Sequence, residues 1–302
     1  MSALAAERVG VRRKFIGSSE VAALFGLDER RTLFELWHQK AGNIPEPDPS
    51  DNQRVFWGTV LEPAIAQGIA GLKGWKIRKV RRYVEHPAVR GMGASLDFEI
   101  YGHPRGPAPL EIKNVDWMIA RSWPDGLPPL RFELQVQHQL ACLPNRPWAA
   151  LGVLIGGNSP KVFEYPRHPG AIARIEHAVA DFWESIEEDR PPAPDFDRDL
   201  PALEALYGKP RRGSVRDLRG DRRLEALCAA YELARGDETA AEKRKRAAKA
   251  EILSIIRDTE TAFCDGFKIL APERPGGDVA YSRRPYRDFR VMARSARVES
   301  RS

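Results

Sequence analysis

The sequence contains few cysteines. Cys142, Cys228 and Cys264 lie far apart among 302 residues and form neither a CxxC motif nor a mixed Cys/His spacing. This scarcity argues against a zinc site and against a disulfide framework. We therefore expect ordinary thiols in a reducing compartment.

Long apolar runs and internal repeats are also missing. We find no run of apolar residues long enough to span a bilayer, and Met1 to Gly10 holds no apolar stretch followed by a small-residue cleavage site. These absences predict a cytoplasmic protein with no membrane partner.

The charge and the length narrow the classes of protein to which this chain can belong. A formal charge of +6 and a pI near 9.3 favour a polyanionic partner, although such a charge is also common among proteins that bind no nucleic acid. With 42% hydrophobic and 30% charged residues, the composition is that of a globular protein. The length suits one large domain plus an appendage.

The spacing of apolar residues predicts an α/β fold. The helices expected are two within 16–42 and one each over 54–72, 132–143 and 171–189, the last with one apolar face (Ile172, Ile175, Val179, Phe182 and Ile186). The strands expected are 75–80, 82–84, 92–100, 110–115, 149–155 and 162–165. This order predicts a mixed β-sheet flanked by helices.

Proline marks the end of this domain. The run Pro191-Pro192-Ala193-Pro194 is a stop signal, which predicts a first domain over 1–197 and a linker over 198–220. The remainder, 221–302, is expected to form a C-terminal appendage with a long helix over 221–257 and short β-pieces such as 267–270.

One group of residues carries a chemical signal. Glu111 and Lys113 are two apart on a predicted strand, so their side chains emerge on the same face, and Asp97 lies on the preceding strand. Two converging carboxylates suit Mg²⁺, and a nearby ammonium can orient or deprotonate a water molecule. The pattern also occurs by chance, and an alternating charged strand is often only a solvated face.

Several blocks of sequence resemble the YqaJ-like viral recombinase family, relatives of the lambda-type phage exonucleases in the PD-(D/E)XK superfamily. The blocks are Ile16-Gly17-Ser18-Ser19-Glu20-Val21-Ala22-Ala23-Leu24-Phe25-Gly26-Leu27, Leu33-Phe34-Glu35-Leu36-Trp37, Phe56-Trp57-Gly58-Thr59-Val60-Leu61-Glu62-Pro63, Ala94-Ser95-Leu96-Asp97, Leu110-Glu111-Ile112-Lys113 and Leu134-Gln135-Val136-Gln137-His138-Gln139-Leu140. They occur in the family's order over most of 12–190, which is more specific than any single motif.

The resemblance implies a restriction-endonuclease-like core and a set of site residues. Asp97, Glu111 and the Ile112 carbonyl would bind Mg²⁺, with Mn²⁺ as a substitute, and Lys113 would act on the attacking water. Glu62 would approach the waters of the metal ion.

Two more parts of the family pattern concern glutamines and a phenylalanine. One of Gln135 and Gln137 would lie near the catalytic lysine or the scissile phosphate, and the sequence leaves open which one. The family usually has glycine after its aspartate, whereas this chain has Phe98, which we expect to point into the core.

Arg12 and Ser19 match the positions that hold a 5′ phosphate in lambda-type enzymes. A hydroxyl ahead of a helix and a nearby guanidinium suit that role. The alternative is equally compatible with the sequence: Ser19 as a plain helix N-cap and Arg12 as a surface residue.

The function that the resemblance implies is a magnesium-dependent exonuclease that degrades linear duplex DNA, 5′ to 3′, and leaves single-stranded tails for recombination. Its partners would be double-stranded DNA ends, a single-strand annealing protein and further copies of itself, a trimer by analogy, in a bacterial host cell if a phage encodes it. The alternatives are a related endonuclease or single-strand nuclease, and a catalytically silent DNA-binding module.

Overall fold

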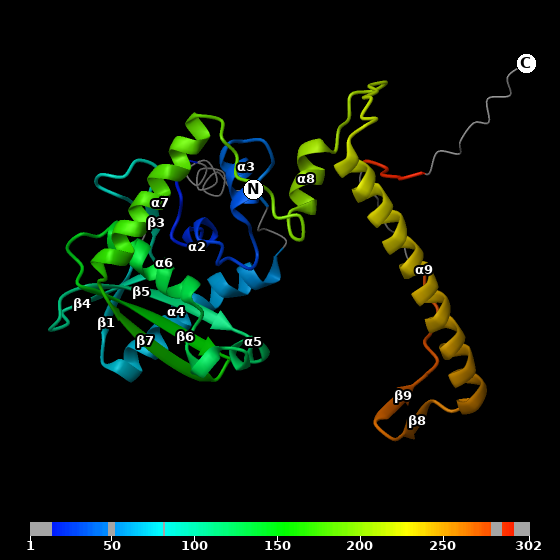
Figure 1. Ribbon diagram of the computed structural model, residues 1–302. Helices are drawn as coiled ribbons and strands as arrows, with labels where there is room; N and C mark the ends of the chain where they lie inside the picture. Colours follow the sequence, from blue (N-terminus) through cyan, green and yellow to red (C-terminus); the bar gives the residue numbers. More distant parts are fainter. Residues whose placement is uncertain (1–13, 48–51, 81, 279–285, 293–302) are drawn as a thin grey trace, which may run out of the picture. The chain divides into compact units, whose positions relative to one another are not determined.

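The computed structural model describes residues 14–47, 52–80, 82–278 and 286–292. The chain divides into two compact units, Met1–Leu206 and Tyr207–Ser302. The first unit holds a β-sheet with helices on its faces, and the second holds a long helix and a β-hairpin (Figure 1).

A five-stranded mixed sheet forms the centre of the first unit, in the order β1-β4-β5-β6-β7 (Figure 1). The strands are β1 (Lys76–Lys79), β4 (Phe98–Tyr101), β5 (Ala108–Val115), β6 (Trp148–Ile155) and β7 (Ser159–Pro166). β5 and β6 run parallel, whereas the other neighbouring pairs are antiparallel. A parallel pair needs a crossover, and the chain here forms α5 (Trp117–Arg121), a 3-10 helix (Pro124–Gly126) and α6 (Leu130–Ala141).

Both faces of the sheet are covered, and the residues of β6 show why. Trp148 and Ala150 pack with Ile69 of the helix α4 (Gln53–Lys73) on one face. Leu151 points to the other face, where Phe132 of α6 packs against its cluster. Successive strand residues alternate between faces, so a strand buried on both sides reads as a continuous apolar run. The predicted fold class, an α/β core with a mixed sheet flanked by helices, is confirmed.

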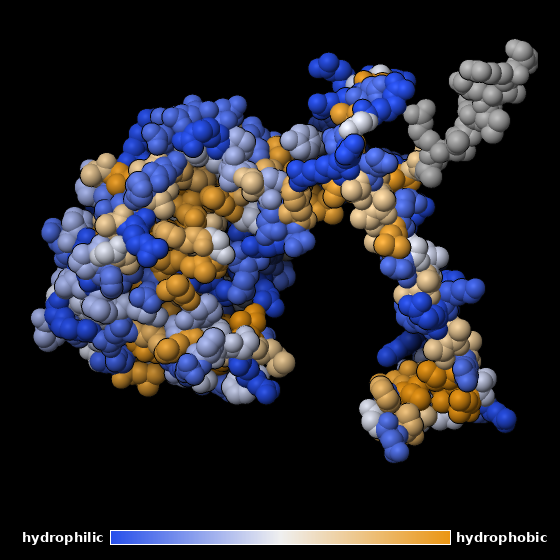
Figure 2. Space-filling view, in the orientation of Figure 1, coloured by the Kyte–Doolittle hydropathy of each residue, from blue (hydrophilic) through white to orange (hydrophobic). Residues whose placement is uncertain are grey.

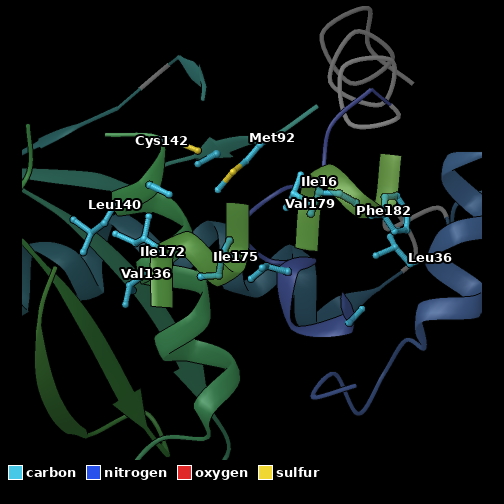
Figure 3. Packing of buried hydrophobic residues seen from close by; sticks show 14 of the residues in the cluster. Ile16, Leu36, Met92, Val136, Leu140, Cys142, Ile172, Ile175, Val179 and Phe182 are labelled. Atoms are coloured by element: carbon cyan, nitrogen blue, oxygen red, sulfur yellow. The ribbon is translucent and has the colours of Figure 1, made fainter. Parts of the chain in front are cut away.

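The largest hydrophobic cluster lies beyond the α6 face of the sheet, under α7 (Pro169–Glu187) (Figure 3). Four residues of the predicted apolar face of α7 are buried there: Ile172, Ile175, Val179 and Phe182. They pack with α6 and with the short helices α2 (Val21–Leu24) and α3 (Leu33–Lys40). Helical spacing alone therefore identified the buried face of α7.

The strand predicted over 92–100 is broken in two, so that prediction was wrong. β3 (Gly93–Ser95) pairs with β2 (Tyr83–Glu85) in a separate two-stranded sheet, while β4 belongs to the main sheet. The break falls at Leu96 and Asp97, and Phe98 resumes the ladder opposite Leu110. A change of sheet reorients the chain at this point, which a run of β-forming residues does not reveal.

The helix α4 departs from two expectations. Judged by length and composition alone, it is the one helix among the described residues that could cross a membrane. From the sequence we expected no apolar run of that length. Its Ile65 and Ile69 are buried against the sheet, which accounts for part of this apolarity. Trp57 lies four residues before Leu61, a helical spacing that predicts a core position, but it is 52% exposed.

The chain after α7 continues in helices. α8 (Leu200–Tyr207) lies in the range predicted as a linker, and its Ala202 is buried against Phe34 and Ile44 of the first unit. The second unit begins with α9 (Arg222–Ile256), whose N-cap Asp221 accepts a hydrogen bond from the Leu224 amide.

A two-stranded hairpin follows α9. Its strands, β8 (Thr261–Cys264) and β9 (Phe267–Leu270), are antiparallel. Gly266 takes the positive φ of 80° that this tight connection requires.

Gly91 lies in the segment that leads into β3 and packs against Trp183. Its substitution tests this contact. Its φ is +72°, and a Cβ there would lie 2.3 Å from Nε1 of Trp183. We expect Gly91→Ala to lower the free energy of unfolding by about 2–4 kcal/mol, since left-handed strain adds to overpacking. Urea unfolding followed by circular dichroism measures this change.

The matched control is Gly26→Ala. Gly26 has a similar φ of +67°, but a Cβ added there would meet nothing within 4 Å. This variant should lose only the strain, about 1–2 kcal/mol. Equal losses in the two variants would show that the Trp183 contact contributes nothing.

Candidate active site

Two residues of β5 meet at the centre of the site. Lys113 Nζ donates a hydrogen bond to Glu111 Oε1 at 2.6 Å. Both side chains leave the same face of the strand because they are two residues apart. The Glu111 side chain is buried, with 4% of the residue exposed, while Lys113 is partly open to solvent.

Two glutamines of α6 complete the set of donors around Glu111. Gln135 Nε2 donates to Glu111 Oε1 and Gln139 Nε2 donates to Glu111 Oε2, each at 2.6 Å. We call Lys113, Gln135 and Gln139 the Glu111 donor cluster. Together they satisfy both oxygens of a carboxylate that would be costly to bury unpaired.

The same geometry separates the glutamines that the sequence left undecided. Gln137 lies on the other side of α6, where its amide donates to the Pro166 carbonyl and accepts from the His168 amide. Gln135 and Gln139 are one helical turn apart and share a face, whereas Gln137 is rotated by about 200° from Gln135. Our sequence reasoning overlooked Gln139, although its four-residue spacing from Gln135 was a usable signal.

Asp97 reaches the site from the break between β3 and β4. Its Oδ2 accepts a hydrogen bond from the Ile112 amide at 2.8 Å. Phe98 is buried in the cluster that packs under α4, so it fills core on the opposite side of the chain. The phenylalanine that replaces the family's glycine therefore leaves Asp97 beside β5.

Glu62 brings a third carboxylate from α4. It forms an ion pair with Lys79 of β1 and lies close enough to Asp97 to affect its ionisation. Burial, together with the negative charges of Glu111 and Glu62, raises the pKa of Asp97 to about 8, against the opposing effects of the Ile112 amide and Lys113. Three carboxylates from three elements thus repel one another at one point.

The donor set is suited to a hard divalent cation. Among the described residues no group of three or more His, Cys, Asp or Glu side chains is placed to hold a metal ion. Mg²⁺, however, usually takes only one or two protein carboxylates and keeps its waters. Asp97 and Glu111 would supply these oxygens, and a cation there would relieve the repulsion that raises the pKa of Asp97.

An open cleft of about 900 Å³ lies beside the Glu111 donor cluster. Lys113 and Gln135 line it, together with Ser19 and the side chains of Arg30, Arg54, Arg131, Trp57, Trp117, Asp28 and Asp116, among others. The basic groups outnumber the acidic ones, so the cleft suits a polyanion.

Ser19 lies in an exposed turn of this cleft. The N-cap of α2 is Glu20, so the alternative that Ser19 is a plain N-cap does not describe this turn. The Glu20 carboxylate accepts from the Gly17 amide at 2.9 Å and pairs with the buried Lys40 at 2.9 Å, which fixes the turn to α3. Arg12, the other residue predicted to hold a 5′ phosphate, lies outside the described residues.

Comparison with known proteins confirms the resemblance found in the sequence. Residues 9–144 match the YqaJ-like viral recombinase domain. The uncharacterised protein YqaJ of Bacillus subtilis (strain 168) is 34% identical over 173 residues, which are 57% of this chain and 53% of that protein. The chain thus matches about half the length of this curated relative.

Three solved structures share part of the course of this chain. The alkaline exonuclease LHK-Exo from Laribacter hongkongensis has a TM-score of 0.49 and 22% identity, over 66% of this chain and 99% of that one. LHK-Exo in complex with dAMP has a TM-score of 0.47 and 22% identity, over 64% and 96%. A SOX–DNA complex has a TM-score of 0.35 and 13% identity, over 60% and 67%.

The raised pKa of Asp97 predicts a pH dependence of stability in metal-free protein. Between the unfolded pKa near 3.8 and the folded pKa of about 8, the folded chain holds a proton that the unfolded chain has lost. The proton on Asp97 therefore adds to the free energy of unfolding. This addition is fully present below about pH 4 and is lost as the pH rises to about 8, at up to about 1.4 kcal/mol per pH unit.

The test is thermal unfolding in EDTA at several pH values between 5 and 8. Asp97→Asn cannot ionise, so it should weaken the decline and melt above the wild type at pH 8. Identical pH profiles for the two proteins would contradict the assigned cause.

Proposed function

Since residues 9–144 match the YqaJ-like viral recombinase domain, we propose that the chain is a divalent-metal-dependent exonuclease that degrades linear duplex DNA, 5′ to 3′, and leaves single-stranded tails for recombination. The observation that carries this proposal is the convergence of Asp97, Glu111 and Lys113 beside one basic cleft. Carboxylates can hold the divalent ion that activates a water molecule, and an ammonium beside them can orient that water.

Each residue has a defined part in the proposed reaction. Asp97, Glu111 and the Ile112 carbonyl would hold Mg²⁺, or Mn²⁺ in its place, and the ion would supply a water of lowered pKa and positive charge beside the phosphate. Lys113 would orient that water and assist its deprotonation. Its hydrogen bond to Glu111 supports this role, because the ammonium lies beside a carboxylate that would bind the ion.

The glutamines of the donor cluster are positioning residues in this proposal. Gln135 and Gln139 each hold one oxygen of Glu111, which fixes the plane of the carboxylate. Glu62 approaches from α4, where its charge would act on waters at the site rather than on the phosphate.

The cleft would receive the end of a duplex. Ser19 would bind the terminal 5′ phosphate together with Arg12, and the basic side chains of the cleft would bind the sugar–phosphate backbone. We place the protein in the cytoplasm of a bacterial host, with double-stranded DNA ends and a single-strand annealing protein as its partners.

Removing the reacting groups should abolish cleavage while the fold remains. We expect Glu111→Gln and Lys113→Ala to slow digestion by at least about 100-fold, because both groups act on the transition state. The measurement is a time course on linear duplex DNA with Mg²⁺, labelled at the 5′ or the 3′ end, which also gives the polarity.

Matched variants and substrates distinguish the alternatives. Gln139→Leu should slow cleavage, whereas Gln137→Leu breaks bonds on the far side of α6 and should lower stability more than rate.

Digestion of covalently closed duplex or of single strands would favour the related nucleases. Binding without hydrolysis in any metal would leave a silent DNA-binding module, and near wild-type rates for Glu111→Gln would refute the site.

The 5′-phosphate proposal predicts a preference between ends. Linear duplex with 5′-phosphorylated ends should be degraded faster than the same DNA with 5′-hydroxyls, because a terminal phosphate carries more negative charge than an internal diester. Arg12→Ala and Ser19→Ala should remove most of that preference while cleavage continues. Initial rates on both end types measure it, and equal rates with the wild type would leave Ser19 and Arg12 with no role in end recognition.

A further inference from the structure

The helix α9 exposes apolar side chains along its length. It has 35 residues, so it extends over about 52 Å, and Ile256 is its one buried residue. Leu224, Leu227, Tyr231, Ile252 and Ile255 are all exposed. Figure 2 shows hydrophobic residues gathered where α9 meets the hairpin. In the described part of the second unit, the ring of Phe289 makes an edge-on contact with Tyr231.

These side chains belong to a regular repeat. Steps of three and four residues along α9 select Leu224, Leu227, Tyr231, Ala234, Glu238, Ala241, Lys245, Ala248, Ile252 and Ile255. We call this row the α9 seam. A period of seven residues with apolar or small side chains at two positions marks a helix that pairs with another in a left-handed coiled coil. Gly236 falls on the side away from the seam, where a partner would not need it.

The seam is complementary to itself in the reverse direction. We infer that α9 pairs antiparallel with α9 of a second copy of this chain. With its centre between residues 239 and 240, the pairing sets Leu224 opposite Ile255 and Leu227 opposite Ile252. Tyr231 then faces Ala248, so the largest seam residue meets a small one.

The two charged seam residues also fit this register. Glu238 faces Ala241, and Lys245 faces Ala234, so each charged side chain lies opposite a small residue and can extend to solvent. A parallel pair in register would instead set Glu238 against Glu238 and Lys245 against Lys245, which repel.

Residues that flank the seam give the same direction. In the antiparallel register, Asp237 lies across from Arg244 of the second copy, and Arg235 lies across from Glu242. In the parallel register, Asp237 would meet Glu242, and Arg244 would meet Lys249. The antiparallel pair therefore matches opposite charges at both flanks, and the parallel pair matches like charges.

The intrahelical ion pairs of α9 do not substitute for this partner. Arg235 pairs with Glu232 at 2.7 Å and Lys245 with Glu242 at 2.8 Å, each within one turn and exposed. Such pairs contribute little to stability. A helix of this length is held mainly by the burial of an apolar row, and a second copy supplies that burial along the whole seam.

The assembly state of the full chain tests the inference. Sedimentation equilibrium across a wide range of protein concentration should give a mass of two chains at high concentration. Leu227→Lys should raise the dissociation constant by about 100-fold or more, since the leucine is buried once in each copy. Leu233→Lys is the matched control: Leu233 is 69% exposed against 57% for Leu227, but it lies outside the seam, so its dissociation constant should stay unchanged.

Three results would overturn the inference. They are a monomeric wild type, equal effects of the two leucine substitutions, and an assembly of any size that survives Leu227→Lys. A monomer would mean that the seam is covered within its own chain or remains exposed.

A charge reversal separates the two directions. Asp237→Arg should weaken an antiparallel pair, because it sets two arginines against each other, and should strengthen a parallel pair. Adding Arg244→Asp should restore the antiparallel pair. Neither position has a charged neighbour three or four residues away along α9, so the change acts across the interface. Strengthening by Asp237→Arg alone would refute the antiparallel arrangement.

Crosslinking tests the register directly. Cys228 lies across from Lys249 in the antiparallel pair, so Lys249→Cys in a Cys264→Ser background should yield covalent dimers with a short bismaleimide. Lys243→Cys, on the outer side of α9, is the control and should not. In a parallel pair, residues 228 and 249 would be about 30 Å apart, and the two variants would crosslink alike.

Discussion

The burial of the Glu111 carboxylate is the constraint on which the first unit depends. A carboxylate so little exposed requires donors on both oxygens, and it takes them from Lys113 on its own strand and from two glutamines of α6. α6 can reach them because β5 and β6 are parallel, and the crossover that joins them lays this helix across the sheet. The topology of the sheet and the ionic centre of the site therefore depend on each other.

The sequence was sufficient where neighbours along the chain determine the outcome. The apolar face of α7 follows from helical spacing, and the meeting of Glu111 with Lys113 follows from the two-residue period of a strand. Both features are local. Their physical basis, the direction in which successive side chains leave the backbone, is already present in the order of residues.

The sequence was insufficient where distant segments determine the outcome. The break at Asp97 arises because β3 and β4 join different sheets, and no residue near it announces a turn. Trp57 lies one helical turn from Leu61, yet the sheet covers only the later part of α4. The spacing of Gln135 and Gln139 puts both on one face of α6, but only the position of α6 over β5 shows that this face meets Glu111. In the second unit, local spacing predicted the long helix α9. The pairing of the α9 seam depends on a second helix, which the sequence of one chain does not show.

α6 also sets the distance between the two carboxylates, through a residue that has no chemical part in the site. His138 Nε2 is 2.9 Å from the carbonyl of Gly93 in β3, a few residues before Asp97. Burial lowers the pKa of His138 to about 4, so the ring stays neutral and keeps donating to that carbonyl throughout the physiological range. α6 thus forms hydrogen bonds to β3 through His138 and to Glu111 of β5 through Gln135 and Gln139. Asp97 follows β3 and Glu111 lies on β5, so one helix contacts both of the segments that carry these carboxylates. A change in the position of α6 would therefore change the distance between the two carboxylates.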